Sequence, residues 1–66
     1  MEDLIDTEIR IARRCYRVCW YRCAEHGAWR AEAAEAGHVV EVIDVGRESE
    51  ALPGLIKVLT RRNGAR

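Results

Sequence analysis

Residues 4–23 read LIDTEIRIARRCYRVCWYRC, and this stretch decides which fold the sequence predicts. Its apolar residues recur at spacings of three and four, so on a helix of about 3.6 residues per turn they fall in one broad arc. That arc contains Leu4, Ile5, Ile9, Ile11, Ala12, Cys15, Tyr16, Val18, Cys19 and Cys23. The opposite arc contains Arg10, Arg13, Arg14 and Arg17. The pattern predicts a strongly amphipathic N-terminal helix.

Helical character continues beyond this stretch. Residues 28–36 are rich in Ala and Glu, and Gly37 is a suitable stop after them. Gly27 offers a break between the two parts. We therefore expect residues 1–36 to form either one continuous helix, roughly 50 Å long at about 1.5 Å per residue, or a helical hairpin broken near Gly27.

The second half of the chain predicts a β-ribbon. Residues 39–45 read VVEVIDV and are dense in β-branched residues, which favours a strand. Residues 55–61 alternate in a way that favours a second strand, after a loop punctuated by Pro53-Gly54. A helix from Ser49 to Arg62 is the competing interpretation, with Ser49 as N-cap and Pro53 tolerated only in its first turn. The expected fold is α+β: one small domain with an N-terminal helical region, a two-stranded antiparallel ribbon over residues 38–61 and a frayed tail over residues 62–66.

The size of the chain favours self-association. A chain of 66 residues without Phe has a thin core, and small domains often compensate by oligomerising. Glu8 and Arg22 project into the apolar arc, where a charge is costly unless it is paired. Two helices packed antiparallel around Cys15 would place Glu8 of one chain opposite Arg22 of the other. The predicted homodimer interface comprises Leu4, Glu8, Ile11, Cys15, Cys19, Arg22 and His26.

Charge is balanced overall but uneven along the chain. The formal net charge is zero, with acidic excess in residues 1–9 and 31–50 and basic excess in residues 10–30 and 51–66. Alternating blocks of this kind suit contacts within the chain or between copies. The first apolar stretch is interrupted by charges and no stretch approaches a membrane span, so we expect neither a signal peptide nor membrane insertion. The three cysteines are odd in number and lack the spacing of a disulfide framework, which favours a reducing, cytoplasmic setting.

The spacing Cys15, Cys19, Cys23 and His26 raises the question of a metal site. On a helix Cys15 and Cys23 are about 12 Å apart, and Cys19 and His26 about 10 Å, whereas zinc ligands lie about 2.0–2.3 Å from the ion. One ion cannot gather all four from a single helix. Cys19, Cys23 and His26 are therefore weak metal candidates, and packing of the thiols is the favoured interpretation. No cofactor is expected.

Residues 28–45 are predicted to form, in order, a helix, a glycine break and an extended strand. In this they are similar to the segment that follows the active site in glutaredoxin-type thioredoxin folds. The resemblance covers about twenty residues. It implies Cys23 as a nucleophile with His26 at the place of the second cysteine. The C-x-x-C motif is missing, and so are the later strands with their cis-proline turn.

The sequence contains no enzyme motif, neither a Gly-rich phosphate loop nor H-E-x-x-H. We therefore expect a small non-enzymatic interaction module, of the regulator or inhibitor type, that binds another macromolecule and most naturally a protein. Aromatic residues and arginines dominate interface hot spots. The predicted contact residues are Arg10, Arg13, Arg14, Arg17, Trp20 and Tyr21. A nucleic-acid binder that uses the four arginines is the first alternative, and a Cys/His metal or thiol-redox protein is the second.

Overall fold

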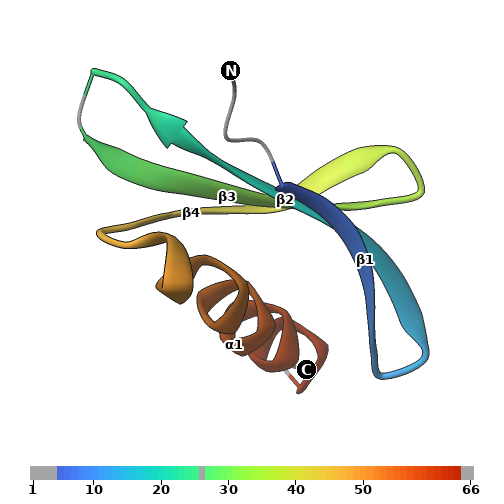
Figure 1. Ribbon diagram of the computed structural model, residues 1–66. Helices are drawn as coiled ribbons and strands as arrows, with labels where there is room; N and C mark the ends of the chain where they lie inside the picture. Colours follow the sequence, from blue (N-terminus) through green and yellow to red (C-terminus); the bar gives the residue numbers. More distant parts are fainter. Residues whose placement is uncertain (1–4, 26, 65–66) are drawn as a thin grey trace.

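The computed structural model describes residues 5–25 and 27–64 of the chain, which form an antiparallel sheet followed by a helix (Figure 1). The sheet has the order β1-β2-β3-β4, so each strand pairs with the next along the chain. The elements are β1 (Ile5–Ile11), β2 (Arg14–Cys23), β3 (Ala28–Glu35), β4 (His38–Val45), a short 3-10 helix η1 (Glu48–Glu50) and α1 (Ala51–Gly64). This order contradicts the expected N-terminal helix with a two-stranded ribbon.

The predicted N-terminal helix is wrong because the apolar pattern has a period of two, with a change of phase. In β1 the odd-numbered residues Ile5, Ile9 and Ile11 face the same side as the even-numbered Tyr16 and Trp20 of β2. The switch from odd to even occurs across the turn at Ala12–Arg13. Two alternating strands of opposite phase mimic the spacings of three and four that are typical of a helix.

Both two-residue turns place their central residues at positive φ. Ala12 and Arg13 have φ of 53° and 70° between β1 and β2, and Ala36 and Gly37 have 53° and 83° between β3 and β4. Two positive values are the signature of a type I′ turn, whose twist matches that of the flanking strands. The second turn has the glycine that this geometry favours. The first turn has none, so the sequence gives no turn signal there.

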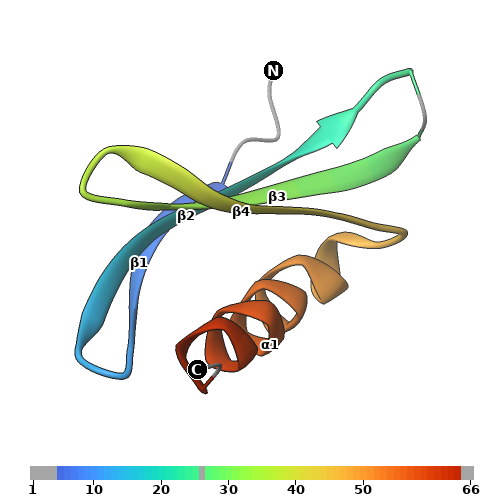
Figure 2. The same cartoon turned by 180° about the vertical axis from the view of Figure 1, so that it is seen from behind.

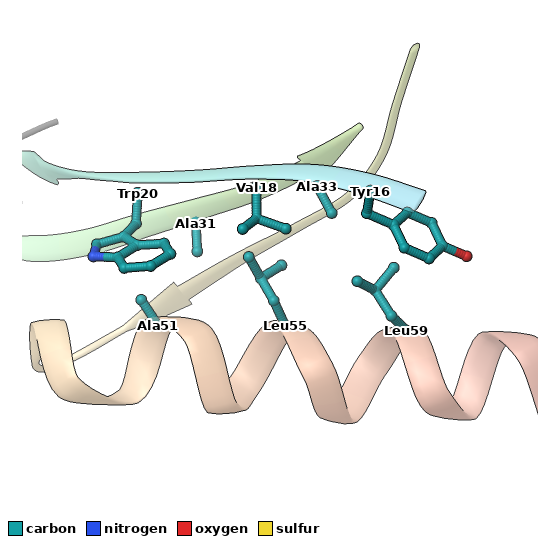
Figure 3. Close-up of a cluster of buried hydrophobic side chains, with 8 residues drawn as sticks. All are labelled: Tyr16, Val18, Trp20, Ala31, Ala33, Ala51, Leu55 and Leu59. Atoms are coloured by element: carbon teal, nitrogen blue, oxygen red, sulfur yellow. The ribbon is translucent and has the colours of Figure 1, made fainter. Parts of the chain in front are cut away.

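The core lies between one face of the sheet and α1 (Figure 2). Tyr16, Val18 and Trp20 point from β2 towards Ala51, Leu55 and Leu59 of the helix (Figure 3). All six are buried, together with Ala31 and Ala33 of β3. The alanines leave room for the helix to approach the middle of the sheet. The packing of Ala31 and Ala33 against α1 therefore outweighs the helix propensity of alanine, on which the predicted helix over residues 28–36 rested.

The second half of the chain contains one strand and one helix. The expected strand at residues 39–45 is confirmed as β4. The expected second strand at 55–61 is wrong, because this segment lies within α1, which continues to Gly64 and includes most of the predicted tail. Pro53 lies in the first turn of the helix, where its missing N–H costs no intrahelical bond. Gly54 lies against β4, since a Cβ there would stand 2.7 Å from Ile43 Cδ1.

The homodimer contact predicted between N-terminal helices is also wrong, because β1 and β2 occupy that part of the chain. Over residues 5–25 and 27–36 the structure has neither a continuous helix nor a helical hairpin, and Gly27, at φ 67°, belongs to the connection between β2 and β3. Within the described residues, α1 is too short and too polar to cross a membrane.

Candidate functional site

One face of the sheet packs against α1, and the other points away from it. We call the face that points away from α1 the open face, and it carries acidic, basic, thiol, aromatic and apolar side chains. Side chains alternate between the two faces of a strand, so every second residue of β2 lies on the open face. The register of the strand pairs shows which residues of β1, β3 and β4 lie on the same face. Its residues are Asp6, Glu8 and Arg10 of β1; Cys15, Arg17, Cys19, Tyr21 and Cys23 of β2; Ala28, Arg30, Glu32 and Ala34 of β3; and Val39, Val42 and Asp44 of β4.

Charged groups on the open face pair across neighbouring strands. Arg17 Nε lies 3.2 Å from Asp6 Oδ1, and its Nη1 lies 3.5 Å from Glu8 Oε2. Arg30 Nε donates to Asp44 Oδ1 at 2.9 Å. These pairs are largely exposed, so each contributes little to stability. Their effect is to hold the arginine side chains along the sheet.

Tyr21 and Cys19 flank Glu32 in the middle of the open face. Tyr21 donates its hydroxyl to Glu32 Oε2 at 2.8 Å, and this hydrogen bond raises the pKa of Tyr21. Burial raises the pKa of the Cys19 thiol, and the negative charges of Glu32 and Asp6 add to the shift. A thiol with a raised pKa is a poor nucleophile at neutral pH. The open face therefore favours a neutral Cys19 over a redox centre.

An apolar patch lies at the β4 side of the open face. Val39 and Val42 are 57% and 50% exposed, which is unusual for valines in a regular strand. Val39 pairs with Ala34 of β3, and Val42 pairs with Glu32. Both valines reach the same face because a bulge opposite Ala33 and Ala34 shifts the register between them. We call Ala34, Val39 and Val42 the valine patch.

No family model, curated protein or solved structure matches this chain. The chemistry of the open face is therefore the evidence for what the protein can bind.

The six predicted contact residues do not form one surface. Arg10 and Arg17 lie on the open face, and Arg13 lies in the β1–β2 turn. Arg14 lies on the helix side and pairs with Glu35 at 3.0 Å. Trp20 is only 8% exposed and donates Nε1 to Glu48 Oε2 at 3.4 Å, so it anchors η1 and cannot act as a surface contact. Tyr21 is half-buried on the open face. The four arginines expected on one face of a helix therefore lie on both faces of the sheet and in the β1–β2 turn.

The predicted dimer residues are likewise divided. Glu8, Cys15 and Cys19 lie on the open face, Ile11 lies on the helix side, and Arg22 lies near the end of β2. Glu8 pairs with Arg17 of its own chain. Leu4 and His26 lie outside the described residues.

The cysteines do not assemble a metal site. Cys15, Cys19 and Cys23 share the open face but are four residues apart along β2, a spacing of about 13 Å between successive thiol-bearing positions. Among the described residues no group of three or more His, Cys, Asp or Glu could hold a metal ion. The glutaredoxin resemblance is also lost, because residues 28–35 form β3 where the resemblance needs a helix.

The valine patch is the part of the site that sequence reasoning missed. Its one signal in the sequence is the β-branched run at residues 39–45. The apolar and polar residues of that run do not alternate, and the bulge explains this, because one extra residue changes the phase within the strand.

Proposed function

We propose that this chain is a small, non-enzymatic protein-binding module of the regulator or inhibitor type, which contacts its partner with the open face and works as a homodimer. The observation that carries the proposal is the exposure of Val39 and Val42 on a sheet face with no helix over it in the described structure. Apolar side chains held on a rigid sheet lose little entropy on binding, so they are favourable contacts.

The charges around the valine patch support a protein partner over nucleic acid. The open face carries four carboxylates, Asp6, Glu8, Glu32 and Asp44, and three arginines. Two of those arginines, Arg17 and Arg30, are already paired with carboxylates. A polyanion would meet net negative charge there, whereas electrostatic contacts with phosphates require a basic surface.

The composition of the open face indicates what its partner should present. We expect the partner to place an apolar side chain on the valine patch and charged groups of both signs beside the surrounding ion pairs. A polar rim around an apolar centre is the usual anatomy of a protein–protein interface.

Two variants test this proposal. Val39→Glu and Val42→Glu place a charge in the valine patch, and Ile56→Glu is the matched control because Ile56 is 40% exposed on α1, away from the open face. Tagged wild-type protein and each variant are incubated with extract of the source cells, the captured protein is identified, and its affinity is measured with purified components. We expect at least a tenfold loss for both valine variants and none for Ile56→Glu, with circular dichroism confirming that all variants fold.

Binding that is equal in all four proteins would contradict the proposal, as would the absence of any partner of defined stoichiometry. Titration of mixed-sequence DNA and RNA tests the alternative. Affinity that falls steeply with salt and is lost in an Arg10→Ala/Arg13→Ala variant would favour the nucleic-acid interpretation instead.

A further inference from the structure

The outer edge of β1 is the feature that suggests how two copies of this chain would meet. In the described structure β1 pairs with β2 on one side and has no strand on the other. Its pairing with β2 runs without interruption from Ile5 to Ile11. The other edge strand, β4, contains the register shift, and bulges are a common way to prevent edge pairing. We propose that a second copy of this chain pairs antiparallel with β1, giving one continuous eight-stranded sheet. This interface rests on the homodimer proposed above.

The sequence of β1 suits a paired strand. It reads IDTEIRI and lacks the Lys, Pro and Gly residues that commonly protect edges. Ile5 and Thr7 remain exposed on the helix side, and Ile5 is 40% exposed. The helix therefore leaves the Ile5–Thr7 part of β1 uncovered, and a second copy could cover it, whereas Ile9 and Ile11 already pack against the core.

The backbone of β1 is correctly oriented for such pairing. Ile11 and Arg14 flank a two-residue turn, where the flanking residues form a hydrogen-bonded pair. Hydrogen-bonded pairs then alternate along the ladder, so the odd residues of β1 bond to β2. The even residues Asp6, Glu8 and Arg10 direct their N–H and C=O groups to the free edge.

Charge complementarity and the length of the pairing together select the register. A two-fold axis perpendicular to the sheet at Glu8 pairs all seven residues and sets Asp6 opposite Arg10 of the partner subunit, twice by symmetry. The two copies of Glu8 then face each other, but each already lies 3.5 Å from Arg17 of its own chain, which reduces their repulsion. An axis at Thr7 would oppose Asp6 to the partner's Glu8, two like charges. An axis at Ile9 would also oppose unlike charges, Glu8 and the partner's Arg10, but it would pair only residues 7–11 of β1.

The same register improves apolar contacts on the helix side. It sets Ile5 opposite the partner's Ile11, again twice. Cross-strand β-branched pairs of this kind stabilise a sheet, and the exposed surface of Ile5 becomes covered. Both open faces lie on the same side of the joined sheet, so the dimer presents two valine patches to its partner.

Light scattering of the reduced protein over a dilution series from about 1 mM tests the interface. We expect wild-type protein to approach twice the 7.5 kDa chain mass. Asp6→Arg should raise the dimer dissociation constant at least tenfold, because it opposes two positive charges. Adding Arg10→Asp should restore the dimer by exchanging the pair. Glu25→Arg, in the β2–β3 connection, is the control for a charge reversal elsewhere and should not change the mass.

A second pair of variants tests the backbone directly. Glu8→Pro removes an N–H that faces the free edge and should give a folded monomer, whereas Glu8→Gln should remain a dimer. Should Glu8→Pro fail to fold, the Asp6/Arg10 exchange alone decides. Wild-type protein of one chain mass at every concentration would overturn both the homodimer and this interface. A dimer that is unaffected by Asp6→Arg would overturn the β1 interface and leave the homodimer standing.

Discussion

Asn63, in the last turn of α1, donates its side-chain amide Nδ2 to the hydroxyl oxygen of Tyr16 in β2 at 3.0 Å. The two residues are 47 positions apart in the sequence. Tyr16 is 1% exposed, so its hydroxyl depends on this contact for a hydrogen-bond partner near the edge of the core. The same Asn63 amide also donates to the Leu59 carbonyl at 2.8 Å. The contact therefore joins the C-terminal end of the helix to the sheet.

Removing this contact should destabilise the protein measurably. Tyr16→Phe keeps the buried ring but leaves Asn63 without this acceptor, and we expect a loss of about 1 kcal/mol in the free energy of unfolding. Asn63→Ala should cost a similar amount, and the double variant should cost less than the sum. Urea denaturation of the four proteins gives the coupling. Strictly additive losses would mean that the hydrogen bond contributes nothing.

The β1–β2 turn should be open to stabilisation. Ala12 and Arg13 both have positive φ, which costs an L-residue about 1–2 kcal/mol. An Asn-Gly pair is preferred in a turn of this type, so the double variant Ala12→Asn/Arg13→Gly should raise the free energy of unfolding by about 1–2 kcal/mol. Thermal or urea unfolding measures the gain.

The β3–β4 turn provides the matched control. Gly37 has φ 83°, and no atom lies within 4 Å of the position that a Cβ would take, so Gly37→Ala tests backbone strain without any clash. It should destabilise the protein by about 1 kcal/mol. Equal stability of Gly37→Ala and wild type would contradict the expected strain of a side chain in the β3–β4 turn.

Gly54 is a glycine whose replacement tests packing between α1 and β4. Alanine is favoured over glycine in a helix by about 1 kcal/mol, but its Cβ would stand 2.7 Å from Ile43 Cδ1. We expect Gly54→Ala to be more favourable in an Ile43→Val background than in the wild-type background, because valine lacks the Cδ1 atom that the new Cβ would displace. A double-mutant cycle measured by urea unfolding distinguishes the two effects. An equal effect in both backgrounds would contradict this contact.

The sequence predicts the local character of some segments better than their arrangement. The run at residues 39–45 indicates a strand because β-branched residues dominate it whichever face they take. The Ala12–Arg13 turn could not be recognised, because neither residue normally adopts positive φ. When that turn is not recognised, the change of the apolar positions from odd to even residue numbers gives the spacings of three and four that predict a helix. The prediction for residues 28–36 failed for another reason, since Ala31 and Ala33 serve the packing of α1 and not local propensity.

For the candidate site, too, the sequence identified some of the residues but not their arrangement. Arg17 and Tyr21 are among the predicted contact residues and do lie on the open face, but their cross-strand neighbours there come from β1 and β3. Sequence spacing along one segment cannot reveal such cross-strand groups. Trp20 is predicted from the sequence to be exposed, yet the alternation of β2 places it in the core beside Ala51 (Figure 3).

The hydrogen bond between Tyr21 and Glu32 predicts a pH dependence. The contact raises the pKa of Tyr21, so the folded state holds this proton more tightly than the unfolded chain does. The resulting stability is complete below the ordinary pKa of tyrosine and is lost as the pH rises through the folded-state pKa. Glu32→Gln removes the negative acceptor and should lower the pKa of Tyr21. Tyrosinate absorbance in a Tyr16→Phe background, which leaves Tyr21 as the remaining tyrosine, reports the titration directly. An unchanged midpoint in Glu32→Gln would show that the carboxylate does not control this hydroxyl.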